Sequence, residues 1–197
     1  MPRNLSSVGV FCGSNPGVDR RFCEAAESLG RLLACRAIRL IYGGGRVGLM
    51  GVLAEAALAE GGEVHGVITR ALEEKEVAHL GLTTLQVVAT MHERKAVMAD
   101  RSDAFVMLPG GFGTLDEFFD VVTWTQLGIH SKPCGILNVG GFFDPLLELF
   151  EAATRERFLR PEHRDMVVVE SDPLAMIERL GSWTPVSVAK WLDLDQR

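Results

Sequence analysis

Short apolar runs alternate with longer amphipathic segments along most of the chain. The apolar runs predict strands, and their continuous hydrophobicity is typical of strands that are buried on both faces of a sheet. Seven strands are expected, at residues 8–12, 38–42, 64–68, 85–88, 104–108, 133–139 and 166–169. Such a sheet must be covered by helices on both sides.

Helical spacing of apolar residues fills several of the intervals between these runs. It predicts helices over residues 20–35 and 49–58, and further helices that open at Met91 and near Leu115. Strands linked by helices of this length form right-handed crossovers, and therefore a parallel sheet. The expected fold class is α/β, with a doubly wound parallel sheet in a three-layer α/β/α sandwich.

The length of 197 residues suits one domain with one sizeable core. We expect this domain to span residues 1–197, with 1–7 and 183–197 as terminal segments. The second segment packs or frays, and its Trp183 and Trp191 indicate docking on the body of the domain.

Composition and charge argue against several classes of protein. Hydrophobic residues make up 47% of the chain and charged residues 23%, which is ordinary for a globular protein. The net charge of −6 disfavours a nucleic-acid surface, because such a surface needs clustered Lys and Arg. No stretch approaches the ~18 apolar residues of a membrane span. We therefore expect neither nucleic acid nor membrane as a partner.

The four cysteines, Cys12, Cys23, Cys35 and Cys134, show no Cys-x-x-Cys spacing. Metal and redox motifs are therefore unsupported, and free thiols in a reducing compartment are favoured over a disulfide framework. We expect a cytoplasmic protein.

Glycine clusters follow three of the predicted strands, at residues 13–17, 43–51 and 109–117. Glycine is needed where the backbone must approach a ligand or take a positive φ, although it also closes many ordinary loops. Because the carboxyl ends of parallel strands meet at one edge of a sheet, the three turns predict a shared crevice. The candidate binding residues in the first two turns are Gly13, Ser14, Gly44 and Gly45.

The third glycine turn reads Pro-Gly-Gly-Phe-Gly-Thr-Leu-Asp-Glu at residues 109–117 and joins a strand to a helix. The start of a helix presents free N–H groups and the positive end of the helix dipole, so this turn predicts an anion site. Glu117 is expected on the first turn of that helix. Its carboxylate is placed either for the dipole alone or for catalysis, and the residues by themselves leave both open.

A second charged group precedes the fifth strand. Helical spacing puts Arg94, Met98 and Arg101 on one face, with Lys95 on a neighbouring face. Arg94 either belongs to a solvated helix face or sits at the mouth of the crevice, where its guanidinium clamps phosphate or ribose oxygens.

Other chemistries find less support. Gly43, Gly45 and Gly48 match the dinucleotide fingerprint, but the next strand ends without the acidic residue that a nicotinamide nucleotide needs, which disfavours a dehydrogenase. His92 and His130 stand outside any metal-ligand spacing. We expect no metal and no cofactor.

Taken together, the motifs at residues 42–51, 91–95 and 109–117 resemble those of the LOG ("lonely guy") family, and the similarity extends from residue 11 to residue 130. The resemblance implies a Rossmann-like fold and a homodimer or higher homo-oligomer. It also implies a cytokinin riboside 5′-monophosphate phosphoribohydrolase, which cleaves AMP or N6-prenyl AMP to the free base and ribose 5-phosphate. Family members were once labelled lysine decarboxylases, but nothing here marks a pyridoxal-binding lysine.

The resemblance also assigns residues. The family's catalytic arginine and glutamate fall on Arg94 and Glu117. Its nucleotide-binding positions fall on Glu76, Lys95, Gly110, Gly111, Phe112, Gly113, Thr114, Leu115, Asp116 and Thr123. Asp116 stands where many relatives have Glu, and Phe112 where many have Tyr, which affects fine geometry and not the reaction class.

A mechanism follows as a hypothesis. Breaking the C1′–N bond leaves an oxocarbenium-like ribose, and Glu117 could stabilise that charge, orient the ribose hydroxyls or activate water. The base pocket is expected near Met91, Met98 or a partner subunit. Two alternatives stay open, an AMP nucleosidase without a cytokinin role and a non-catalytic nucleotide-binding or carrier protein.

Overall fold

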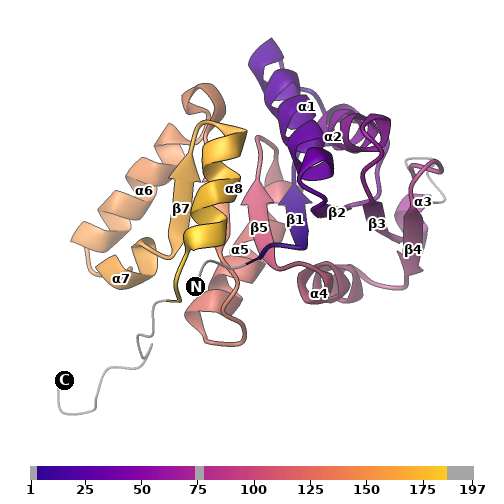
Figure 1. Ribbon diagram of the computed structural model, residues 1–197. Helices are drawn as coiled ribbons and strands as arrows, with labels where there is room; N and C mark the ends of the chain where they lie inside the picture. Colours follow the sequence, from indigo (N-terminus) through magenta and orange to yellow (C-terminus); the bar gives the residue numbers. More distant parts are fainter. Residues whose placement is uncertain (1–3, 74–77, 186–197) are drawn as a thin grey trace.

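The computed structural model describes residues 4–73 and 78–185, which form a parallel seven-stranded sheet with helices on both faces (Figure 1). The strands run in the order β4-β3-β2-β1-β5-β6-β7. Their bounds are β1 Ser7–Phe11, β2 Arg39–Tyr42, β3 Val64–Thr69, β4 Thr84–Val88, β5 Ala104–Met107, β6 Cys134–Leu137 and β7 Val167–Glu170. The structure confirms the doubly wound α/β prediction.

Helices alternate with the strands and form two outer layers. Their bounds are α1 Arg20–Cys35, α2 Gly48–Ala59, α3 Arg70–Glu73, α4 Met91–Arg101, α5 Phe112–Gln126, α6 Asp144–Arg155, α7 Pro161–Arg164 and α8 Pro173–Ser182, with a 3₁₀ turn η1 at Val139–Gly141. One hydrophobic cluster joins the sheet to α1, α2 and α8, and a second joins it to α4, α5 and α6. The sheet is thus the middle layer of a three-layer sandwich (Figure 1).

The predicted strands all occur, with shifted ends. The sixth is shorter than the predicted 133–139, because the chain turns into η1 after Leu137. Helix α1 has the predicted bounds, whereas α5 begins three residues before Leu115. Gly113 therefore lies inside the first turn of α5, although glycine lowers helix propensity.

The order of the strands places a topological switch point between β1 and β5. From β1 the chain proceeds to β4 in one direction across the sheet, and from β5 to β7 in the other. At the start of this seam the Asp103 carboxylate accepts hydrogen bonds from the backbone and hydroxyl groups of Ser6 and Ser7. At its end Leu108 N donates to Phe11 O at 2.9 Å. Ligand crevices of such folds lie beyond the carboxyl ends of the strands at this point.

Three further sequence predictions concern the C-terminal segment, the cysteines and membrane spans. Trp183 packs against the core cluster of α1 and α8, whereas Trp191 lies outside the described residues. All four cysteines are free thiols. Within the described ranges, no helix combines the length and the apolar character that crossing a membrane requires.

Candidate active site

The three glycine turns meet at the switch point. Gly13 N donates to Pro109 O at 3.0 Å, and Gly13 O accepts from Leu49 N, also at 3.0 Å. The turn after β1 is therefore bonded to the turn after β5 on one side and to the start of α2 on the other. Gly48 has a φ of +59° and lies against the backbone of Ser14, so this contact has no room for a side chain. The three turns predicted to share a crevice are thus in contact with one another.

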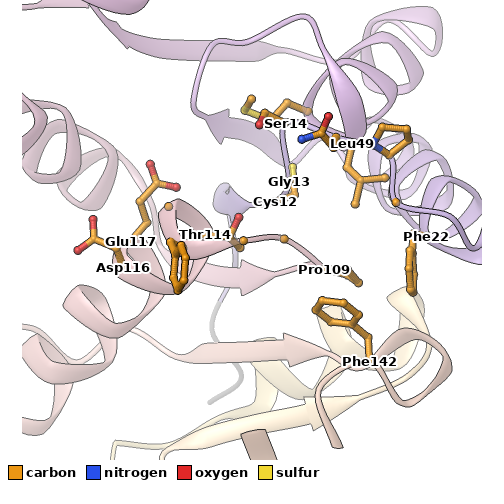
Figure 2. Close-up of a pocket in the computed structure, with 18 of the residues that line it drawn as sticks. Cys12, Gly13, Ser14, Phe22, Leu49, Pro109, Thr114, Asp116, Glu117 and Phe142 are labelled. Atoms are coloured by element: carbon orange, nitrogen blue, oxygen red, sulfur yellow. The ribbon is translucent and has the colours of Figure 1, made fainter. Parts of the chain in front are cut away.

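A cavity of about 520 Å³ opens where these turns meet (Figure 2). Its walls come from the turns after β1, β5 and β6, from α3, from the first turns of α1, α2 and α4, and from the first two turns of α5. The lining residues are Cys12, Gly13, Ser14, Asn15, Pro16, Gly17, Phe22, Leu49, Met50, Leu72, Met91, Arg94, Pro109, Gly110, Gly111, Phe112, Gly113, Thr114, Asp116, Glu117 and Phe142. This volume lies in the range of small-molecule sites.

The start of α5 forms an anion cradle in the floor of this cavity. Gly111 is the N-cap, and the N–H groups of the first helical turn lack intrahelical acceptors. A Cβ atom at Gly111 or Gly113 would meet nothing within 4 Å, so the backbone here borders open space. A Cβ at Gly110 would instead collide with the Thr114 side chain. The arrangement suits a phosphate held by N–H groups and the Thr114 hydroxyl.

Arg94 is fixed beside this cradle by three acceptors. Its Nε donates to Val67 O at 2.8 Å, its Nη2 to Gly43 O at 3.3 Å, and its Nη1 to the carboxylate of Glu117. The side chain is buried, with the residue only 6% exposed. The solvated-face interpretation is therefore wrong for Arg94, although Arg101, predicted on the same face, is exposed.

The local sequence explains how α4 positions Arg94 at the cavity. Thr90 is the N-cap, and its hydroxyl accepts from Glu93 N at 3.1 Å, while the Glu93 carboxylate accepts from Ala89 N at 2.9 Å. The Thr90 cap and the bond from Ala89, the residue before it, to Glu93 together fix the first turn of α4. Met98, one turn after Arg94, anchors the helix in the core and is fully buried. Met98 therefore does not line the cavity, whereas Met91 does.

Glu117 lies in the second turn of α5, because the helix begins at Phe112. The first-turn placement expected from the sequence is wrong, and Glu117 owes less to the helix dipole than predicted. The residue is 9% exposed. Burial raises the pKa of Glu117 above its ordinary value, while the charge and hydrogen bond of Arg94 oppose that rise. The carboxylate is thus a buried group whose ionised form depends on its arginine partner.

Lys95 joins α4 to α5 next to this pair. Its Nζ lies 2.5 Å from an Asp120 oxygen and 3.1 Å from an Asp116 oxygen. Partial burial alone would lower the pKa of Lys95, but the hydrogen bonds and charges of Asp120 and Asp116 raise it overall. Lys95 is therefore charged and engaged with α5, outside the cavity lining.

The structure gathers most of the sequence-predicted residues in one cavity, but not all. Those in the lining are Gly13, Ser14, Arg94, Gly110, Gly111, Phe112, Gly113, Thr114, Asp116 and Glu117. Gly44 and Gly45 face the β3–β4 side, where Gly44 O accepts from His79 N and Gly45 bridges Ala78. Leu115 packs into the core, and Thr123 is exposed further along α5. Glu76 lies outside the described residues.

Sequence reasoning placed Met91 and Phe112 at the site but missed the other apolar residues of the lining. Phe22 lies in the first turn of α1, and Phe142 follows Gly140 and Gly141 after β6. That Gly-Gly pair forms a fourth glycine turn after a strand. It was the sequence signal that could have placed Phe142 at the site. Cys12 also lines the cavity, where burial and then the charge of Glu117 raise the pKa of its thiol well above the usual range.

This geometry defines a class of protein. A parallel doubly wound sheet, a helix-start anion cradle at the switch point, and a buried arginine–glutamate pair beside it make a pocket for a phosphorylated small molecule. A family model described as "Possible lysine decarboxylase" matches residues 50–180. Curated relatives match nearly the whole chain, and the chain belongs to the LOG family of cytokinin riboside 5′-monophosphate phosphoribohydrolases.

Two relatives illustrate the match. The cytokinin riboside 5′-monophosphate phosphoribohydrolase of Rhodococcoides fascians is 52% identical over 167 residues, covering 84% of this chain and 84% of that protein. The phosphoribohydrolase LOG5 of Arabidopsis thaliana is 42% identical over 180 residues, covering 91% of this chain and 79% of that protein. The family predicted from the motifs is confirmed.

Solved structures show the same fold at lower identity. The molybdenum cofactor binding protein of Rippkaea orientalis is 21% identical with a TM-score of 0.67, covering 89% of this chain and 94% of that one. The Moco carrier protein of Chlamydomonas reinhardtii is 19% identical with a TM-score of 0.66, covering 90% and 98%. At this identity the likeness supports the Rossmann-like fold alone.

Proposed function

We propose that this protein hydrolyses the N-glycosidic bond of adenosine 5′-monophosphates, including N6-prenylated ones, and releases the free base and ribose 5-phosphate. The observation that carries the proposal is the buried Arg94–Glu117 pair, set beside a helix-start anion cradle in one cavity. The names of the relatives, which are 42% to 52% identical, support the same reaction.

The cradle at the start of α5 would hold the 5′-phosphate. The first-turn N–H groups and the Thr114 hydroxyl offer donors to a phosphate, and the helix dipole favours its charge. The ribose would then extend toward Arg94 and Glu117, which line the same cavity. A substrate without a phosphate loses the group that fixes this orientation.

Glu117 would act where positive charge develops. As the C1′–N9 bond breaks, its electron pair leaves with the base, which takes up a proton, and the ribose becomes oxocarbenium-like. A carboxylate in a low-dielectric site stabilises that charge strongly, and the water that attacks C1′ loses its proton. The charge and hydrogen bond of Arg94 oppose the rise in the pKa of Glu117 that burial causes, and the bonds of Arg94 to Val67 and Gly43 hold the pair in place.

The test is direct turnover. The purified protein is incubated with AMP, N6-prenyl AMP and adenosine, and free base and ribose 5-phosphate are measured by chromatography. We expect release from both monophosphates and far less from adenosine. Absence of base release from either monophosphate would contradict the enzyme proposal, and tight binding without hydrolysis would indicate a carrier instead.

Lysine chemistry receives no support from the site. Of the two lysines in the described ranges, Lys95 is engaged with Asp116 and Asp120, and Lys132 donates to Ala99 O at 2.7 Å. Neither lines the cavity, so neither is placed to form a Schiff base there. The decarboxylase label of the family model therefore finds no counterpart in this site.

We also propose a cytoplasmic homodimer. Leu127 and Ile129 are exposed apolar residues at the end of α5 and just beyond it, and Leu149 and Phe158 are exposed on and after α6. Contiguous exposed apolar patches are typical of association surfaces, and these residues are our candidates for such a patch. Light scattering on the purified protein should give about twice the chain mass of 21.5 kDa, and a monomer mass would contradict the dimer.

A further inference from the structure

We infer that the cavity contains a second binding lobe, on the far side of the anion cradle from Glu117, which takes a planar group linked through the phosphate of a bound nucleotide. The inference rests on the proposed function in placing the phosphate at the start of α5 and the ribose at Glu117. The aromatic lobe consists of Pro16, Phe22, Leu49 and Phe142. Figure 2 shows Phe22 and Phe142 on one side of Thr114 and Pro109, with Glu117 and Asp116 on the other.

The chain holds the two rings of the lobe in place. Phe22 and Phe142 pack edge to face with centroids 5.5 Å apart, and Phe142 packs the same way on Phe143 at 4.9 Å. Gly17, with a φ of +74°, lies so close to the Phe22 ring that a Cβ there would contact it at 2.7 Å. The rings are thus positioned by neighbours on three segments of the chain.

The lobe remains open although it is apolar. Phe142 is 44% exposed, and Phe22 is only partly buried. The four side chains of the lobe carry no charge and no hydrogen-bonding group, whereas the opposite end of the cavity carries Arg94, Asp116 and Glu117. The cavity therefore has a polar end and an aromatic end, with the cradle between them.

A nucleoside monophosphate does not use both ends. With its phosphate in the cradle and its ribose at Glu117, the molecule ends at the phosphate, and only a further substituent on that phosphate reaches the aromatic lobe. Aromatic side chains favour planar partners through stacking and edge contacts. The ligand class is therefore a nucleoside 5′-phosphodiester whose second substituent is planar, such as the second base of a dinucleotide.

The experiment compares two esters of equal charge. Affinities of the methyl and phenyl esters of AMP are measured by calorimetry in a Glu117→Gln background, so that no base is released during titration. We expect the phenyl ester to bind about tenfold more tightly than the methyl ester, because the ring is buried in the lobe. Phe142→Ala in the same background should reduce this ratio to about twofold, and Leu174→Ala, exposed outside the cavity, should leave it unchanged.

Equal affinity for the two esters in the background protein would overturn the inference. So would a Phe142→Ala variant that weakens AMP and both esters by the same factor, because the ring would then serve the base or the fold. The ratio of the two ester affinities is measured without any turnover of substrate. If AMP is not hydrolysed but the ratio is as expected, only the proposed function fails, and if AMP is hydrolysed but the ratio is one, only this inference fails.

Discussion

Arg94 shows how one buried side chain can hold three segments of the chain together. Its planar guanidinium bonds to β3 through Val67, to the turn after β2 through Gly43, and to α5 through Glu117. A lysine ammonium is a point charge without this fork of donors, so it could not join the three segments in the same way. The position of the Glu117 carboxylate is thus set from three sides of the crevice.

Replacing the carboxylate separates binding from chemistry. Glu117→Gln keeps the size of the side chain but removes the charge that would stabilise the developing cation. We expect kcat for AMP to fall about a hundredfold or more, while the affinity for AMP stays within a few-fold, because the cradle is untouched. Steady-state kinetics with calorimetry checks this, and wild-type turnover in the variant would show that Glu117 has been given the wrong role.

Gly43 tests the placement of Arg94 without altering any charge. A Cβ at this position would collide with Nη2 of Arg94 and lie 3.3 Å from Met50 Sδ. We expect Gly43→Ala to displace the guanidinium, to lower kcat at least about tenfold, and to cost about 1–3 kcal/mol of unfolding free energy. Chemical denaturation and kinetics on the same samples measure both, and unchanged kcat would argue against a fixed Arg94.

At the scale of elements, the strands were predictable and the layers only in part. Continuous apolar runs identify the strands because burial on both faces leaves no alternation. The interval that holds α6 was left unassigned, although Leu146, Leu147 and Phe150 recur there at helical spacing and pack against the core. The glycine turns were found because glycine has a distinct backbone role. Phe22 and Phe142 were not identified from the sequence, because their contact depends on where α1 and the β6–α6 turn lie in three dimensions.

The same limit applies to the ion pairs between α4 and α5. The sequence indicates that Lys95 lies beside Arg94, but its pairing with Asp120 follows from how the two helices pack. Residues 25 positions apart become partners only through that packing.

This cross-link should matter for activity more than for stability. Asp120→Asn removes the closest carboxylate from Lys95 and loosens α4 against α5, which carry Arg94 and Glu117. We expect a several-fold loss of kcat and a loss of less than about 1 kcal/mol in unfolding free energy, because Asp120 is partly exposed. Glu24→Gln, which breaks an exposed pair with Arg20 on α1, is the matched control and should change neither. Equal effects of the two variants would contradict a positioning role for Asp120.

At the scale of the whole molecule, His130 makes folding sensitive to acid. Burial, followed by the charge of Lys132, lowers the pKa of His130 from 6.5 to about 4. Its Nδ1 accepts a hydrogen bond from Lys132 N at 3.2 Å, and its ring packs near Phe105 and Trp124. The folded state therefore holds His130 neutral at a pH where the unfolded chain binds a proton.

The sign of the effect follows from this difference. Above about pH 6.5 the histidine is neutral in both states and its full contribution to stability is present, whereas between about 6.5 and 4 the unfolded state takes up the proton first. We expect the unfolding free energy to fall as pH falls through this window. The fall should be smaller in His130→Gln, and the exposed His92→Gln should retain it. Denaturation curves at several pH values give the unfolding free energy as a function of pH. An identical pH dependence in wild type and His130→Gln would exclude His130 as the cause.

The seam between β1 and β5 has a consequence for how the molecule comes apart. One half-sheet contributes Gly13, Leu49 and Arg94 to the crevice, and the other contributes the start of α5 with Glu117. Neither half-sheet contains the crevice by itself. A nucleotide that lies across the seam would bind only when the two half-sheets are joined. Its binding would therefore raise the free energy needed to separate them.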